Sequence, residues 1–333
     1  MMSYTWSSGC GGATSVRCTA RSHPTGPGAH CNDRSSTILK DTVKKTWIAA
    51  LAALLGSANA PAADEVSTSC SDEAAKTSHG VLRVLTLNTS HGRNTALNQF
   101  LVSKQRTYEN LDSIAELLVA RKPDVVGLQE ADGPSRWSGG FDHVGYLAER
   151  TGYPCFVHGL HSTSWMASYG TALLTQAELL APASLSFKPS PPSKQKGFVT
   201  GTIRWQSAEG ERRVTVVSVH LDFLGRGTRD RQVAEMVAHL DDVDGSLIIL
   251  GDLNSEWLSE GSHVQQLGTK LGLRAFEPEN FDLGTYKRIT GKRLDWILIS
   301  QDLEFQRHEV LPDVVADHFA VYAEITYRRD SDQ

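Results

Sequence analysis

Carboxylate, amide and imidazole side chains recur at one end of successive apolar segments in this sequence. The clearest case is the apolar segment 247–250, which a glycine separates from Asp252 and Asn254. A charged group beside a buried strand costs free energy unless it is paired or binds a cation. The other residues in comparable positions are Asn88, Glu130, His220, Asp295, Asp317 and His318. Together they supply oxygen ligands for a divalent cation, two imidazoles, and carboxylates to orient them, which are the parts of a hydrolytic site.

Each of these residues also has a simpler structural interpretation. Asp252 and Asn254 are two positions apart, so their side chains leave the same side of the backbone if extended geometry continues through the turn. A β-turn in which Asp252 caps the next helix explains this segment equally well. A single histidine, aspartate or asparagine at a strand end is more often a turn or surface residue. The functional hypothesis therefore depends on the whole set.

The segments that carry these residues have the periodicity of strands and helices in alternation. We expect helices over 106–121, 140–151 and 228–240. The proline-rich segment 188–196 is predicted to be a surface loop, because strand-like sequence resumes at Phe198. Strands are expected over 81–88, 124–130, 153–158, 169–175, 214–220, 247–250, 294–300 and 316–325. One mixed α/β domain over residues 79–328 accounts for this pattern, followed by a short tail at 329–333.

Seven of these motifs, taken in order, resemble the endonuclease/exonuclease/phosphatase superfamily, which includes deoxyribonuclease I and the sphingomyelinases. They are the segments 85–88, 127–130, 169–174, 218–222, 251–254, 293–297 and 316–318. The resemblance covers essentially the whole predicted domain. It implies a four-layer α/β sandwich, in which two mixed β-sheets pack face to face with helices on the outside, and a site at one edge of the strands.

The resemblance also implies roles for the residues that match. Glu130 would be the principal ligand of a Mg²⁺ or Mn²⁺ ion, with Asn88 beside it and Asp317 as a further candidate ligand. Oxygen ligands suit such hard cations. Asp252 and Asn254 would position the attacking water and contact the phosphoryl group. The implied activity is metal-assisted attack of water on phosphorus.

Two histidines complete the implied mechanism. His318, paired with Asp295, would take the proton of the water, although Asp252 is the alternative general base and both assignments stay open. His220 would donate a hydrogen bond to a phosphate oxygen or to the leaving group. Three residues are candidate supporting or substrate groups: Gln129, Thr171 and Asp222. Thr171 stands where asparagine is common in the family, which puts a substrate contact at this position in doubt.

The N-terminal segments have the character of an export signal. Residues 43–60 have two lysines, an apolar middle and a small-x-small end, as in a secretory signal peptide cut after Ala60. Residues 1–42 precede this signal, so we expect them to be a non-native or disordered extension and translation to start at Val43. An uncleaved anchor or a buried helix is the alternative. Residues 61–78 would be a flexible N-terminus of an exported, periplasmic or extracellular protein.

Charge and cysteines limit the functions that this protein could have. The 333-residue chain has 33 basic and 38 acidic side chains. Without residues 1–60, which hold six basic and two acidic side chains, 27 and 36 remain, a net charge of −9. This balance argues against a strong, sequence-independent DNA binder. Cys70 and Cys155 remain, either as a disulfide or as two buried thiols.

The substrate class stays open at this point. We expect a phosphodiester or phosphomonoester, with a secreted nuclease, a sphingomyelinase-like enzyme, an inositol-phosphate phosphatase and a non-catalytic binding protein as alternatives. We find no exposed aromatic hairpin of the kind that a membrane-acting sphingomyelinase uses. A monomer is expected, with no obligate protein partner. Side chains that could stack on a base or sugar are Trp137, Trp165, Tyr169 and Tyr286, and basic ones that could meet phosphates are Arg93, Arg136, Arg226 and Lys287.

Overall fold

The computed structural model describes residues 66–72, 74, 80–208 and 210–328. The predicted extension over 1–42, the signal peptide over 43–60 and the tail over 329–333 lie outside the described residues, as does most of segment 61–78.

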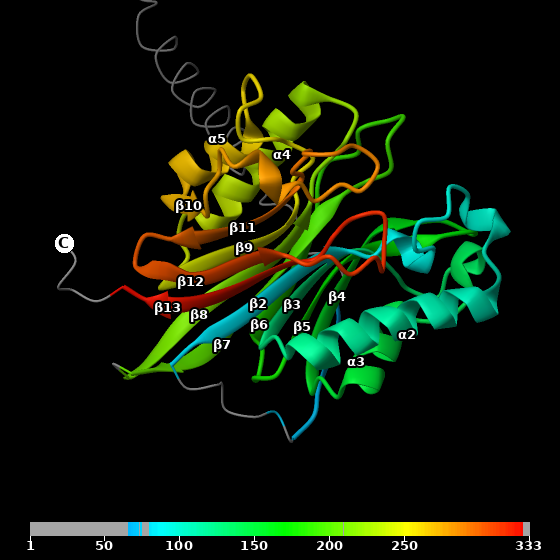
Figure 1. The fold of residues 1–333 in the computed structure, drawn as a ribbon, viewed down its shortest axis with the longest axis horizontal. Coiled ribbons are helices and arrows are strands. Elements are labelled where there is room, and N and C mark those ends of the chain that lie inside the picture. Colours follow the sequence, from blue (N-terminus) through cyan, green and yellow to red (C-terminus); the bar gives the residue numbers. More distant parts are fainter. Residues whose placement is uncertain (1–65, 73, 75–79, 209, 329–333) are drawn as a thin grey trace, which may run out of the picture. The chain divides into compact units, whose positions relative to one another are not determined.

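Two β-sheets pack face to face at the centre of the structure (Figure 1). In spatial order, the seven-stranded sheet consists of β1 (Val66–Cys70), β4 (Cys155–Thr163), β5 (Ser168–Thr175), β3 (Val125–Asp132), β2 (Leu82–Asn88), β13 (Val321–Tyr327) and β12 (Leu303–Val310). The six-stranded sheet consists of β10 (Leu273–Ala275), β11 (Asp295–Ser300), β9 (Ser246–Asp252), β8 (Gly210–His220), β7 (Gly197–Ser207) and β6 (Leu180–Ser186). Each sheet is mixed, because one pair in each, β2–β3 and β8–β9, is parallel.

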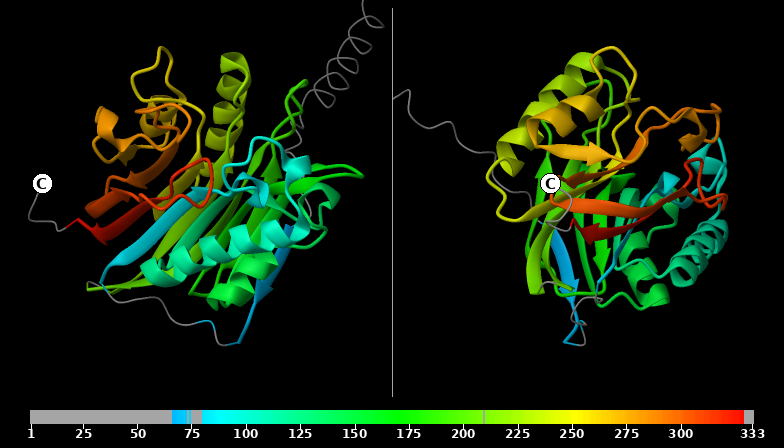
Figure 2. Two further views of the ribbon diagram at one scale, coloured as in Figure 1. Left: turned by 45° about the vertical axis from the view of Figure 1, so that its right-hand side comes forward. Right: turned by 60° about the vertical axis from the view of Figure 1, so that its left-hand side comes forward.

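Helices cover the outer face of each sheet (Figure 2). On one side lie α2 (Lys104–Arg121) and α3 (His143–Thr151), and on the other lie α4 (Arg226–Leu240) and α5 (His263–Lys270). Four 3₁₀ segments lie in the connections: η1 (Ser90–Gly92), η2 (Gln99–Leu101), η3 (Arg136–Ser138) and η4 (Phe281–Leu283). The prediction of a four-layer α/β sandwich is confirmed.

Three apolar clusters hold these layers together. The middle one lies between the sheets and includes Val84, Trp205 and Ile248. The outer ones join α2 and α3 to the seven-stranded sheet and α4 and α5 to the six-stranded sheet. Helix α2 shows how the sequence produces this packing. Its buried residues recur at helical spacing, the Ser103 side chain accepts the Arg106 backbone N–H at its start, and Lys122 ends it in a left-handed conformation before a proline.

Strand register brings the polar strand ends together. Asn88 on β2 lies opposite Gln129 on β3, and Asp252 on β9 lies between His220 on β8 and Asp295 on β11. The two sheets pack face to face, so these ends from both sheets meet at one edge of the sandwich. The edge is therefore fixed by core packing and backbone pairing rather than by the polar residues themselves.

Several predicted boundaries differ from the structure by a few residues, and two of the differences change the description of the chain. Strand β13 begins at Val321, so the prediction of a strand from residue 316 is wrong for its first five residues. They form a loop in which only His318 makes a β-bridge, to Tyr286. At the other end, β1 pairs with β4 ahead of the predicted domain start at residue 79, and Cys70 forms a disulfide with Cys155. None of the described helices is long and apolar enough to cross a membrane.

Candidate active site

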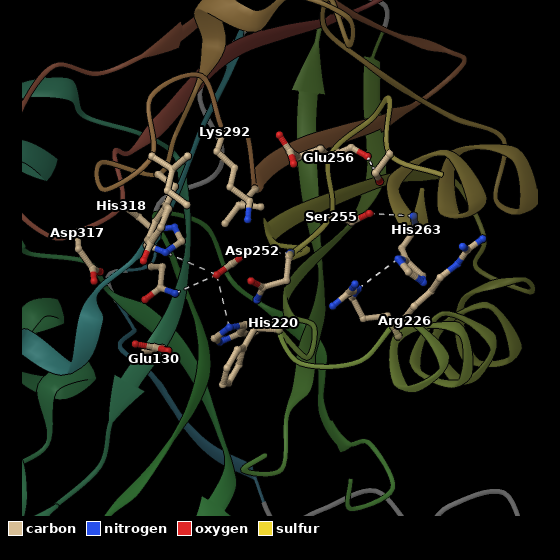
Figure 3. Close-up of a pocket in the computed structure, with 18 of the residues that line it drawn as sticks. Glu130, His220, Arg226, Asp252, Ser255, Glu256, His263, Lys292, Asp317 and His318 are labelled. Carbon is tan, nitrogen blue, oxygen red and sulfur yellow. Dashed lines mark hydrogen bonds and ion pairs between the residues drawn. The ribbon is translucent and has the colours of Figure 1, made fainter. Parts of the chain in front are cut away.

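A cavity of 560 Å³ opens at the edge where the strand ends meet (Figure 3). Seven of the eight residues predicted to act in catalysis or metal binding line it, namely Asn88, Glu130, His220, Asp252, Asn254, Asp317 and His318. The eighth, Asp295, is fully buried directly behind His318. The structure therefore brings together, in one cavity, residues that are up to 230 positions apart in the sequence.

Asp252, His318 and Asp295 form a buried group on one side of the cavity. His318 Nδ1 lies 2.7 Å from Asp295 Oδ2, which also accepts the Thr285 hydroxyl at 2.6 Å, and His318 Nε2 lies 3.9 Å from Asp252 Oδ2. Burial disfavours the imidazolium, but Asp295 and Asp252 outweigh it and raise the pKa of His318 to about 10. Burial and the charge of Asp295 raise the pKa of Asp252 to about 7.

Asp252 is held in place by hydrogen bonds from two sides. Asn88 donates from Nδ2 to Asp252 Oδ2 at 3.1 Å, and the Asn254 backbone N–H donates to Oδ1 at 3.0 Å. Asn254 has φ +46°, so extended geometry does not continue through this turn. Its side chain instead donates to the Leu221 carbonyl at 3.0 Å. Asp252 and Asn254 reach the same cavity because the chain turns between them, and not because side chains alternate along an extended strand.

Glu130 lies on the opposite side of the cavity on a distorted strand. Its φ is +49°, and the pairing of β3 with β5 shifts register at this residue. Such bulges re-aim a side chain, and unusual backbone conformations of this kind cluster at functional sites. Burial opposes ionisation of Glu130, but the electrostatic attraction of neighbouring basic side chains, first His91 and then Lys196, keeps its pKa below its ordinary value.

Arg93 joins Glu130 to Asp317. Its guanidinium lies 3.6 Å from Glu130 Oε2 and 3.1 Å from Asp317 Oδ2. Asp317 also accepts the Ser90 hydroxyl and pairs with Arg288 at 3.1 Å. Arg93 is therefore part of the site. An isolated arginine in a loop is more often exposed to solvent and unpaired.

His220 lines the cavity between these two sides, and Lys196 is buried against it. Lys196 Nζ lies 3.2 Å from His220 Nδ1 and 3.9 Å from Glu130 Oε1, and His220 Nε2 lies 3.5 Å from Asp252. Burial, followed by the charge of Lys196, holds the pKa of His220 well below its ordinary value, and burial also lowers the pKa of Lys196. The prediction that segment 188–196 is a surface loop is therefore wrong for Lys196, which is buried.

The three supporting residues lie beneath or beside the cavity rather than in its lining. Gln129 is fully buried and donates to Ser218 at 3.1 Å. Thr171 is also buried, 2.8 Å from His161 Nε2. The Asp222 carboxylate accepts the Ser193 hydroxyl and the Leu224 backbone N–H. Gln129 and Asp222 thereby connect strands or loops that carry residues of the site, whereas Thr171 connects β5 to β4.

The candidate substrate-contacting residues are dispersed. Tyr286 and Arg226 line the cavity, whereas Arg136 and Lys287 are exposed. Trp137 and Tyr169 pack against His91. Trp165 is 75% exposed in the turn that joins β4 to β5. An exposed tryptophan at this hairpin turn was not anticipated from the sequence.

Sequence reasoning missed His91, Lys196 and Asp132. His91 Nε2 lies 3.2 Å from Glu130 Oε2, and its Nδ1 lies 2.7 Å from Asp132 Oδ1. A signal for His91 exists in the sequence, since His91-Gly92 follows the Asn88 strand end closely. Lys196 gives no such signal, because its burial depends on the packing of the loop before β7.

A four-layer sandwich with acidic, amide and histidine residues at its strand ends defines a hydrolase of the phosphatase or nuclease type. The sequence model of the Endonuclease/Exonuclease/phosphatase family matches residues 85–318, and the chain belongs to this family. A search of curated proteins finds no match.

Solved structures share this fold. A family protein from Leptotrichia buccalis is 17% identical, with a TM-score of 0.57 over 74% of this chain and 100% of that one. The human Nocturnin catalytic domain with bound sulfate is 20% identical, with a TM-score of 0.56 over 75% and 94%. The mannosyl-6-phosphatase of Bacteroides thetaiotaomicron is 16% identical, with a TM-score of 0.55 over 74% and 100%. At these identities the likeness is one of fold.

Proposed function

We propose that this protein is an exported, Mg²⁺- or Mn²⁺-dependent hydrolase that cleaves a phosphodiester or phosphomonoester bond by attack of water on phosphorus. One observation carries the proposal. Asp252 and His318, with Asp295 buried behind His318, share a single cavity with Glu130, Asn88 and Asp317; Figure 3 shows Asp252, His318, Glu130 and Asp317 around it. A proton acceptor and an oxygen-rich cation site on opposite sides of one cavity suit hydrolysis of an anionic ester.

The donor set beside Glu130 fits a hard divalent cation. Glu130, Asn88 and Asp317 line one cavity with carboxylate and amide groups, and the ion pairs of Arg93 with both carboxylates support a site that favours positive charge. Bound there, a metal ion would neutralise charge on a phosphate oxygen. Asp252, Asp295 and His318 also have ligand atoms within 4.8 Å of one another, but the hydrogen bonds to Asp295 suit a proton-transfer group better.

Asp252 is the residue best placed to accept the proton of the attacking water. Its carboxylate borders the cavity, its two hydrogen bonds fix its orientation, and its pKa of about 7 is matched to general base catalysis near neutral pH. His318, with a pKa of about 10, is charged at that pH and is already protonated. We therefore assign the general base to Asp252, and to His318 the electrostatic stabilisation of the phosphoryl group.

His220 and Asn254 complete the contacts to the phosphoryl group. Burial and Lys196 keep His220 neutral, so it can donate one hydrogen bond to a phosphate oxygen or leaving group while Lys196 holds its ring. Asn254 is anchored by its Nδ2 on Leu221, and it lines the cavity next to Asp252. These contacts would orient the ester for attack by water.

A sphingomyelinase-like activity is the second candidate, favoured by Trp165. Its indole is 75% exposed at a hairpin turn, and tryptophan side chains are common where a protein meets a membrane surface. The hairpin joins β4 to β5, and β5 pairs with β3, the strand that carries Glu130. A lipid headgroup phosphodiester therefore belongs among the substrates to be tested.

An activity panel tests the proposed reaction. It would offer bis-p-nitrophenyl phosphate, plasmid DNA, single-stranded RNA, sphingomyelin, an inositol polyphosphate and a sugar phosphate to residues 61–333, with Mg²⁺ or with EDTA. We expect turnover of at least one substrate with Mg²⁺ and none with EDTA. Silence across the panel from folded protein that binds Mg²⁺ would favour the non-catalytic binding alternative.

Export is supported by the Cys70–Cys155 disulfide, because such bonds persist in oxidising compartments. The signal-like segment over 43–60 supports it independently. We expect the protein recovered from the periplasm or medium of a bacterial expression host to begin at Pro61. N-terminal sequencing that finds residues 1–42 retained would contradict the predicted start and cleavage sites.

A further inference from the structure

His91 lies between two carboxylates at the back of the Glu130 side of the cavity. Its Nδ1 lies 2.7 Å from Asp132 Oδ1, and its Nε2 lies 3.2 Å from Glu130 Oε2. Both of its neighbours lie on β3, on either side of Ala131. The imidazole is nearly inaccessible to solvent, at 6% exposure.

This arrangement determines where the protons of the ring can be. The short contact to Asp132 places a proton on Nδ1, since a buried carboxylate can only accept. In the neutral ring Nε2 is then a lone pair, and it faces a second acceptor, Glu130 Oε2. Two acceptors at this distance need a cation between them, either a proton or a metal ion.

The distance between the two acceptors fits a shared metal ion. Metal bonds of about 2.1 Å place two neighbouring ligand atoms about 3.0 Å apart in octahedral geometry and about 3.4 Å apart in tetrahedral geometry. The observed 3.2 Å between Nε2 and Oε2 lies between these values. A histidine that binds a metal through one nitrogen usually donates its other N–H to a carboxylate, as His91 does to Asp132.

We propose that His91 is a nitrogen ligand of the cation bound by Glu130, and that this site takes a nitrogen-accepting divalent ion such as Mn²⁺ or Zn²⁺ in preference to Mg²⁺. The inference deepens the proposed function and rests on its metal dependence. It adds an imidazole to the oxygen ligands that the sequence predicts. Imidazole suits transition metals, whereas Mg²⁺ prefers oxygen.

The surroundings of His91 hold the ring in this orientation. It packs between Trp137 and Tyr169, with ring centroids 4.8 and 4.6 Å away. Asp132 is fully buried and accepts the indole N–H of Trp137 at 2.7 Å and the hydroxyl of Ser138. A carboxylate fixed in this way orients the imidazole and makes Nε2 a better ligand.

Arg93 does not take the place of such a ligand. Its Nη1 lies 3.6 Å from Glu130 Oε2, beyond hydrogen-bond range, so this oxygen keeps a lone pair for a metal ion. Arg93 is bonded more closely to Asp317 at 3.1 Å. The guanidinium and a metal ion can therefore share the Glu130 carboxylate.

His91→Asn is the most direct test. His91 has φ +53°, and asparagine tolerates this conformation better than most residues while offering an oxygen in place of nitrogen. Isothermal titration of the whole protein should show Mn²⁺ affinity at least about 10-fold lower in the variant and Mg²⁺ affinity changed by less than about 3-fold. Pulsed electron paramagnetic resonance of the Mn²⁺-loaded protein should show a ¹⁴N coupling that His91→Asn removes.

His220→Asn is the matched control, because His220 is another buried histidine of the cavity, and it should keep the ¹⁴N coupling. Mn²⁺ binding without a ¹⁴N coupling in the parent protein, or a coupling that survives His91→Asn, would overturn the assignment of His91 and leave the proposed metal dependence intact. Equal losses of Mn²⁺ and Mg²⁺ affinity would overturn the preference. Failure to bind any divalent ion would overturn both the inference and the metal dependence.

Discussion

Replacing Asp252 with asparagine should lower kcat by about 10³-fold, the larger of the two effects that we expect from single substitutions. Asparagine has nearly the same shape as aspartate, but its amide cannot take the proton of the attacking water. The hydrogen bond from the Asn254 backbone N–H can persist to the amide oxygen, so the turn is retained. The loss should therefore appear in kcat, measured under metal saturation, with little change in the thermal unfolding midpoint.

The pH profile distinguishes loss of a base from loss of shape. In the parent protein, kcat/KM should rise as Asp252 ionises around its pKa of about 7. The variant should lose this acidic limb. An Asp252→Asn protein with more than about a tenth of the parental kcat, or with an unchanged acidic limb, would remove Asp252 from the role of base.

Replacing His318 with glutamine should lower kcat by about 10²-fold. Glutamine preserves polarity and approximate length but carries no positive charge to stabilise the phosphoryl group. Asp295 Oδ2 contacts the Thr285 hydroxyl and His318 Nδ1 in the parent protein. The substitution removes the imidazole contact and leaves the buried carboxylate with the Thr285 hydroxyl. We therefore expect a modest loss of thermal stability together with the loss of rate.

Asp295→Asn is the matched comparison for His318. It keeps the imidazole but removes the charge that does most to raise its pKa toward 10. If the charged imidazolium is the active form, kcat/KM should fall as pH rises through about 10 in the parent and at lower pH in Asp295→Asn. An alkaline limb at the same pH in both proteins would show that His318 acts in another way.

The sequence was sufficient to predict that the eight candidate catalytic and metal-binding residues lie close together. Their positions at strand ends, together with the alternation of strands and helices, imply that they gather at one edge of a sheet. The register of β8, β9 and β11 fulfils this for His220, Asp252 and Asp295. The gathering of these residues at one edge depends on local periodicity and on the order of the motifs along the chain. Both can be recognised in a single sequence.

What the sequence could not provide is the backbone geometry that aims these side chains. Glu130 and Asn254 both have a positive φ angle, which is uncommon for residues other than glycine. The pattern of residue types around them does not predict this conformation. Strand β13 begins five residues later than predicted, because Ala316–Ala320 has strand-like composition but forms the loop that presents Asp317 and His318.

Contacts between segments far apart in the chain could not be predicted from the sequence either. Lys196 follows a proline-rich segment that suggests exposure, yet its ammonium is buried against His220. His91 and Asp132 are 41 positions apart, and only the pairing of β2 with β3 brings them together. Burial of a charged group depends on its partners, and those partners are known only once the fold is known.

The measurement that tests the central claim most directly is a Mg²⁺ and Mn²⁺ titration of phosphoester hydrolysis by the parent protein and by Glu130→Gln. Glutamine retains the size of Glu130 and removes the charge that would hold the cation. We expect no turnover in EDTA, recovery with added metal, and a titration midpoint for Glu130→Gln at least about 10-fold higher than that of the parent. Full activity in EDTA, or identical midpoints for the two proteins, would contradict metal-assisted hydrolysis at this cavity.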